Sequence, residues 1–117
     1  MTSKPGALAE KLAEKYLISQ GLRLIKRNWR CRMGEIDLIC REGNCLVFVE
    51  VRLRTNSNFG GPAASITRTK QTRLLRAARQ YLVFNPAANC RFDAILLSAL
   101  NEHCIEWIRN AFDAAEY

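Results

Sequence analysis

Apolar residues that recur every three or four positions predict two helices. The first runs over about residues 5–20, where a charged face opposes the apolar one and Gly21 follows as a stop. The second begins at about Ser65 and ends at Asn85-Pro86. A short helix is expected after Arg109. The apolar stripes of the two main helices consist of Leu8, Leu12, Ala13, Tyr16 and Leu17, and of Leu74, Leu75, Ala78, Tyr81 and Leu82.

Other segments are typical of strands, since apolar residues there alternate or form short runs between turn formers. Strands are predicted over residues 22–30, 34–41, 45–52, 90–99 and 104–108. Residues 53–62 are rich in turn formers and are expected to form a mobile loop. A chain of 117 residues has room for one hydrophobic core. The pattern therefore predicts a single α/β domain over residues 1–117.

The hairpin between the second and third strands predicts a definite register. Gly43-Asn44 suits a two-residue loop, and paired residues then have numbers that sum to 87. Asp37 lies opposite Glu50 and Glu35 opposite Arg52 on one face, since strand side chains alternate. A one-residue slip would turn carboxylates into the core. The other face is expected to be wholly apolar, with Ile36, Leu38, Cys40, Val47, Val49 and Val51.

The predicted pair of Asp37 and Glu50 points to a divalent cation. Carboxylates about 5 Å apart at Cβ repel each other unless a cation lies between them. Magnesium takes one or two protein carboxylates and completes its shell with water and phosphate. Arg52 would point at the phosphate charge. The alternative is an ordinary ion pair between Glu35 and Arg52, with the remaining carboxylates in solvent.

The net charge of +7 indicates that the protein binds a polyanion in addition to a metal ion. Thirteen of the 18 basic residues are arginine, whose fork suits phosphate. The expected partner is nucleic acid, DNA in particular. The alternative is a solvated basic surface. The arginines expected to contact nucleic acid are Arg54, Arg68, Arg73, Arg76 and Arg79.

Several classes of protein and site are disfavoured by the sequence. No apolar run approaches the roughly 18 residues of a membrane span, and no secretory pattern opens the chain, so a cytoplasmic protein without a membrane partner is expected. The five cysteines include no Cys-x-x-Cys pair, which indicates free, mostly buried thiols rather than zinc. Asp93 is expected to be a structural carboxylate, His103 a turn residue, and Trp29 either core or, like Phe59, a stacking surface for bases.

Two motifs carry a family resemblance. Gly-Glu-Ile-Asp-Leu-Ile at residues 34–39 and Val-Phe-Val-Glu-Val-Arg-x-Arg at 47–54 resemble the YraN family of uncharacterised bacterial proteins. That family is similar to the PD-(D/E)xK nuclease superfamily. The resemblance covers nearly the whole chain. Further matching residues are Gly6, Ala9, Glu10, Ala13, Tyr16, Leu17, Arg27, Asn28, Phe59, Gly60, Pro62, Lys70, Leu74, Ala77, Ala78, Tyr81, Leu82, Arg91, Phe92 and Asp93.

The resemblance implies a restriction-endonuclease-like α-β-β-β-α-β core with a mixed central sheet flanked by helices, like that of archaeal Holliday-junction resolvases. It implies that Asp37 and Glu50 bind Mg²⁺ or Mn²⁺, with Glu10 as a further acidic contributor. Arg52 departs from the superfamily, which has lysine there. Arginine can stabilise phosphate charge but offers no neutral amine. Lys70 would supply that amine, or would be a solvated helix lysine.

Three functions follow from these residues. The first is a metal-dependent endonuclease that hydrolyses DNA, with Asp37, Glu50, Arg52 and Lys70 as catalytic residues. The second is a nucleic-acid-binding module that has lost its chemistry through Arg52. The third is an adaptor that binds another protein. Cleavage of a branched junction would call for a homodimer.

Overall fold

Two helices and a five-stranded sheet make up the computed structural model, which describes residues 4–54 and 66–112. The α/β class predicted from the sequence is confirmed. In chain order the elements are α1 (Lys4–Ser19), β1 (Arg23–Cys31), β2 (Gly34–Glu42), β3 (Cys45–Leu53), α2 (Arg68–Phe84), β4 (Asn89–Leu97), the 3₁₀ helix η2 (Glu102–Cys104) and β5 (Ile105–Phe112).

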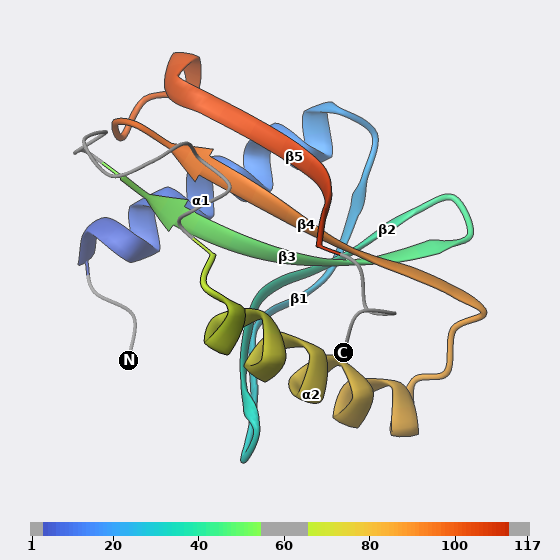
Figure 1. Ribbon diagram of the computed structural model, residues 1–117. Helices are drawn as coiled ribbons and strands as arrows, with labels where there is room; N and C mark the ends of the chain where they lie inside the picture. The colour runs from blue at the N-terminus through green and yellow to red at the C-terminus, as the bar shows by residue number, and fades with distance from the viewer. Residues whose placement is uncertain (1–3, 55–65, 113–117) are drawn as a thin grey trace.

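The strands lie in the order β1-β2-β3-β4-β5. All neighbouring pairs are antiparallel except β3 and β4, which are parallel and joined through α2. A parallel pair needs a long crossover, and the helix provides it. Helix α1 covers one face of the sheet and α2 the other (Figure 1). The sheet is therefore mixed and flanked by helices, as expected.

Each face of the sheet has its own apolar core. The core under α1 is built on Ala13 and Leu17 of the helix and on Leu38, Val47 and Val49 of the sheet. The core under α2 is separate, and its central ring is Phe48. That ring packs edge-on to Tyr81 at 6.0 Å between ring centroids and lies nearly parallel to Phe92 at 5.4 Å. Both faces of the sheet are therefore covered by a helix and carry a cluster of buried side chains.

The predicted register between β2 and β3 is confirmed for five pairs, from Glu42↔Cys45 to Leu38↔Val49. Beyond Leu38 the two strands separate. A carboxylate oxygen of Asp37 accepts the N–H of Val51 at 2.9 Å, in the position where a strand neighbour would supply a carbonyl. The expected strand pairings of Asp37 with Glu50 and of Glu35 with Arg52 are therefore wrong, because β2 has left β3 by that point, although the charge of Glu50 still acts on Asp37.

The separation also corrects the expected apolar face. Ile36 is fully buried in the core under α2, whereas Leu38 belongs to the core under α1. Strict alternation would have put both residues on one face. The change of side falls at Asp37, where the ladder to β3 ends.

From this point β2 pairs with β1 alone, as far as Cys31↔Gly34. The resulting two-stranded segment, residues 28–37, is called the β1–β2 arm. It runs down beside α2 in Figure 1. Trp29 packs edge-on to Tyr81 of α2, with ring centroids 5.4 Å apart. A Cβ atom on Gly34 would lie 3.3 Å from the carbonyl oxygen of Arg73, so only glycine allows this close approach to α2.

Some element boundaries differ from the sequence prediction. Residues 109–112 continue strand β5, so the expected short helix after Arg109 is wrong for these residues. Helix α2 begins at Arg68, where Thr67 caps it by accepting the N–H of Lys70 at 3.2 Å. Ser65, Phe59 and most of the expected mobile loop lie outside the described residues.

All five cysteines are free, as expected, but only Cys40 is fully buried and Cys90 is exposed. His103 lies in η2, within the expected turn between β4 and β5. In the two described stretches of chain, neither helix has the length and apolar character needed to cross a membrane.

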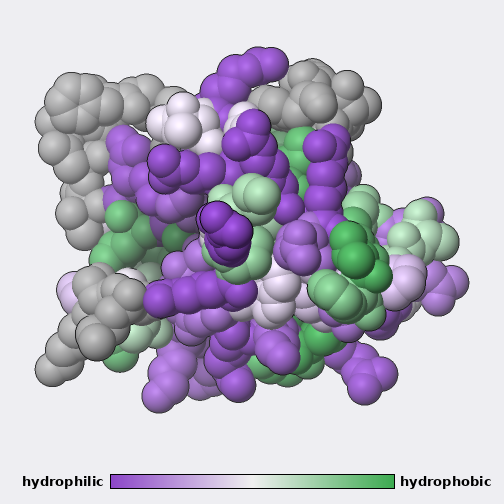
Figure 2. Space-filling view, turned by 90° about the horizontal axis from the view of Figure 1, so that it is seen from below, coloured by the Kyte–Doolittle hydropathy of each residue, from purple (hydrophilic) through white to green (hydrophobic). Residues whose placement is uncertain are grey.

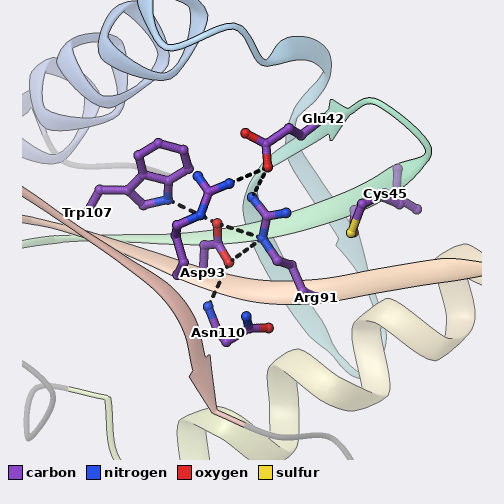
Figure 3. Close-up of polar contacts among 8 residues, drawn as sticks. Glu42, Cys45, Arg91, Asp93, Trp107 and Asn110 are labelled. Carbon is purple, nitrogen blue, oxygen red and sulfur yellow. Dashed lines mark hydrogen bonds and ion pairs between the residues drawn. The ribbon is translucent and has the colours of Figure 1, made fainter.

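Asp93 anchors the polar part of the face covered by α1 (Figure 3). It is 1 % exposed. Its oxygens accept the Arg91 Nε–H at 3.0 Å, the Trp107 Nε1–H at 2.9 Å and the backbone N–H of Asn110 at 3.0 Å. Glu42 at the β2–β3 turn forms ion pairs with Arg91 and Arg109. The network ties β4, β5 and the hairpin turn together, so Asp93 is the structural carboxylate expected.

Because Asp93 satisfies three donors in the interior, we expect Asp93→Ala to lower the free energy of unfolding by about 3–5 kcal/mol. Asp93→Asn should lose less, since the amide oxygen still accepts. Urea denaturation monitored by circular dichroism measures both. Glu106→Ala, at an exposed position of β5, is the matched control and should stay within about 0.5 kcal/mol of wild type. A loss below about 1 kcal/mol in Asp93→Ala would contradict this role.

Candidate metal and nucleic-acid site

Acidic residues from three elements approach one another beside the point where β2 leaves β3. They are Glu10 of α1, Asp37 of β2 and Glu50 of β3. The sequence predicted Asp37 and Glu50 as an exposed pair. The structure corrects the exposure, since Glu50 is only 3 % accessible and Asp37 is half-buried.

The carboxylate of Asp37 is held in place by the hydrogen bond that it accepts from the Val51 N–H. The pKa of Asp37 is raised from 3.8 to about 7, first by burial and then by the negative charge of Glu50. The Val51 N–H and the ammonium of Lys70 oppose this shift. A carboxyl group with this pKa is about half protonated near pH 7, and a further positive charge beside it would favour the ionised form.

Glu50 has a direct cationic partner in Lys70, whose Nζ lies 2.8 Å from Glu50 Oε1. Burial raises the pKa of Glu50, while Lys70 and then Arg52 lower it. Lys70 reaches the carboxylate because it precedes Leu74 by four residues and so lies on the packed side of α2. The alternative of Lys70 as a freely solvated helix lysine is therefore wrong.

Glu10 stands beside this pair. Burial raises the pKa of Glu10 from 4.5 to about 7, with the charge of Asp37 as the next cause. The amide nitrogen of Asn28, turned toward the carboxylates, lies 2.9 Å from Glu10 Oε1 and 3.2 Å from Glu35 Oε1. Asn28 has a left-handed backbone, φ 48°, which asparagine tolerates better than most residues.

Sequence reasoning noted Asn28 only as a family match and gave it no role in the site. The signal that could have identified it is an asparagine inside a predicted strand, between Arg27 and Trp29, where β propensity disfavours it. Glu35 pairs with Arg30 of the neighbouring strand, with Arg30 Nε 3.4 Å from Glu35 Oε1. The alternative of an ordinary ion pair between Glu35 and Arg52 is thereby corrected.

The residues fit a hard divalent cation, although with few protein ligands. Within residues 4–54 and 66–112, no group of three or more His, Cys, Asp or Glu side chains is placed to hold a metal. Asp37 and Glu50 supply two carboxylates, which is the number that Mg²⁺ commonly takes from a protein. Their pKa values are raised chiefly by burial, which penalises the charged form of each carboxyl, and a bound cation would favour that form.

The basic residues predicted for nucleic acid fall into two groups. Arg52 and Arg54 are half-buried at the end of β3, and the charge of Arg52 reaches Glu50. Along α2 the arginines lie on the outer surface, away from the core. Hydrophilic side chains cover most of the face seen from the α2 side, with apolar areas between them (Figure 2). The exposed arginines of α2 are Arg68, Arg73, Arg76 and Arg79.

Comparison with known proteins gives consistent matches over most of the chain. Residues 9–97 match the uncharacterised protein family UPF0102. A UPF0102 protein of Nitrosospira multiformis is 57% identical over 109 residues, 92% of each chain. One from Nitrosomonas europaea is 56% identical with the same coverage. One from Legionella pneumophila is 47% identical over 117 residues, covering 97% of this chain and 98% of its own. These names state no activity.

The raised pKa values predict that the metal-free protein loses stability as pH rises. Between about pH 4 and 7 the folded protein binds more protons than the unfolded chain, because Asp37 and Glu10 titrate near 7 only when folded. We expect the free energy of unfolding to be lower at pH 8 than at pH 5 by on the order of 1–3 kcal/mol. Urea denaturation across this range measures it.

The variants Asp37→Asn and Glu10→Gln should each flatten this dependence, since neither amide titrates. Glu102→Gln is the matched control, because Glu102 is exposed in η2 and should leave the profile unchanged. A wild-type slope in both site variants would show that other groups cause it.

Proposed function

This chain belongs to the uncharacterised protein family UPF0102, and from that premise we propose that it is a divalent-metal-dependent endonuclease that hydrolyses DNA. The observation that carries the proposal is the burial of Asp37 and Glu50 next to each other, with Lys70 ion-paired to Glu50. Such a cluster is unfavourable for stability, and unfavourable buried charge is typical of functional sites. Among the described residues, the basic surface of α2 supports a polyanionic substrate.

Asp37 and Glu50 would hold the cation, Mg²⁺ or Mn²⁺, and Glu10 would bind its water ligands. When bound, the cation would polarise a phosphodiester oxygen and make a bound water more acidic. Arg52 carries a guanidinium group, which would bind the phosphate and stabilise the charge that develops there. Lys70 has the amine that Arg52 lacks, and in this proposal it would exchange a proton with the attacking water.

A second candidate is a DNA-binding module without chemistry. The observation that favours this second candidate is Arg52, because the nuclease superfamily that the chain resembles has lysine at that position. The two candidates differ in whether the protein binds a metal and cleaves DNA. Within the endonuclease candidate, the role of Lys70 can be tested by substitution. If its amine moves a proton, arginine cannot replace it, and if it only balances the charge of Glu50, arginine can.

The first test is isothermal titration of Mn²⁺, run beside a nuclease assay on branched and single-stranded DNA. We expect wild type to bind the metal and cleave, and Asp37→Asn and Glu50→Gln to lose both. Glu102→Gln is the control and should behave as wild type. No metal binding by wild type would overturn the endonuclease and leave the DNA-binding module.

Lys70 gives a sharper prediction. Lys70→Met and Lys70→Arg should both reduce cleavage by about 100-fold or more, while Mn²⁺ still binds. Circular dichroism melting checks that both variants fold. Near-wild-type cleavage by Lys70→Arg would show that the residue supplies charge alone.

DNA binding itself depends on the outer arginines of α2. Replacing Arg76 and Arg79 together with alanine should reduce the slope of log K against log salt by about 1–2, because each phosphate contact contributes about 0.9. Fluorescence anisotropy at several salt concentrations measures the slope. Replacing Lys11 and Lys15, exposed on α1 at the opposite face, is the matched control. An equal loss in the control would mean that the arginines of α2 form no defined contact.

A further inference from the structure

The β1–β2 arm ends in a feature that the proposed chemistry does not use. Its turn consists of two residues, Arg32 and Met33, between the last paired residues Cys31 and Gly34. Met33 is 51 % exposed, and Arg30 and Arg32 beside it are exposed as well. The tip of the arm therefore presents one long apolar side chain next to guanidinium groups.

The arm is held firmly against α2. Trp29 packs on Tyr81, Ile36 is fully buried in the core under α2, and Gly34 touches the backbone of Arg73. Each contact comes from a different position along the arm, so its direction is fixed. The tip that carries Met33 is therefore held in a fixed position beside α2.

The position of the tip relative to the acidic residues is also fixed. Met33 lies in the turn, four residues before Asp37 of β2, so the Cα atoms of the two residues are at most about 13 Å apart at roughly 3.3 Å per residue. Arg73 lies beside the arm at Gly34. A DNA strand whose phosphate reached Asp37 and Glu50 would thus meet Arg30, Arg32 and Met33 a short distance along its length.

We propose that Met33 is a wedge that enters an interruption in the base stacking of DNA, such as a bulge, a nick or a branch point. The inference rests on the proposed function, in that it takes DNA as the substrate. Apolar side chains, methionine among them, insert between base steps while neighbouring cations hold the phosphates. Unstacking an intact step costs a few kcal/mol, and a step already interrupted costs less. The arm therefore selects interrupted DNA over continuous duplex.

The test compares two duplexes of the same flanking sequence, one continuous and one with a two-nucleotide bulge that carries 2-aminopurine beside it. Binding is measured by anisotropy in EDTA, where no cleavage occurs, and unstacking by the emission of 2-aminopurine. We expect wild type to bind the bulged duplex about tenfold more tightly and to increase the emission.

Met33→Ser should reduce this preference to below about threefold and abolish the rise in emission, whereas Met33→Leu should keep both. Val83→Ser is the matched control, because Val83 is an equally apolar side chain, 66 % exposed, near the end of α2. It should leave the preference unchanged. Arg32→Ala should weaken binding to both duplexes by a similar factor, since it contacts phosphate.

The outcomes separate the wedge from the proposed function. DNA binding with a preference that Met33→Ser leaves intact would overturn the wedge and leave the DNA-binding function standing. A wild type that binds both duplexes equally would do the same. A wild type that binds neither duplex would overturn the proposed function and the wedge with it.

Discussion

The separation of β2 from β3 at Asp37 is the constraint on which the rest of the site depends. A buried N–H must find a partner when its strand neighbour leaves, and the Asp37 carboxylate supplies one to Val51. The ladder can therefore end without an orphaned donor. From that point β2 is free to turn toward α2, which buries Ile36 there and carries the β1–β2 arm away from the sheet. The same bond fixes a carboxylate beside Glu50.

That arrangement has an electrostatic consequence. Two carboxylates in a partly dehydrated place repel each other, and both pKa values are raised. One residue from another element limits the cost, since the ammonium of Lys70 lies against Glu50. The ion pair also ties the first turn of α2 to the middle of β3. A bound cation would balance part of the charge of Glu50 that Lys70 balances when no cation is bound. The amine of Lys70 would then be free to leave the ion pair.

Much of the fold and of the site was predictable from the sequence. The rest could not be predicted, and the reason is physical. Alternation and the Gly43-Asn44 loop predicted the β2–β3 register, because a slip would bury charge. Alternation does not mark where a ladder ends, so the change of side at Ile36 and the partner of Glu35 were missed. The role of Lys70 was open, although its spacing of four from Leu74 indicated the packed side of α2. Whether these residues bind metal stays a prediction.

Two aspartates of the sheet, the buried Asp93 and the half-buried Asp37, differ in how far the fold satisfies their charge. Asp93, on the face covered by α1, accepts three hydrogen bonds and forms an ion pair with Arg91, so its charge is satisfied within the fold. Asp37 accepts the one bond from Val51 and has Glu50 and Glu35 as negatively charged neighbours. Because the fold completes the surroundings of Asp93, an added cation would gain little there. Around Asp37 the neighbouring carboxylates leave an excess of negative charge. An external cation with a phosphate ligand would balance that charge.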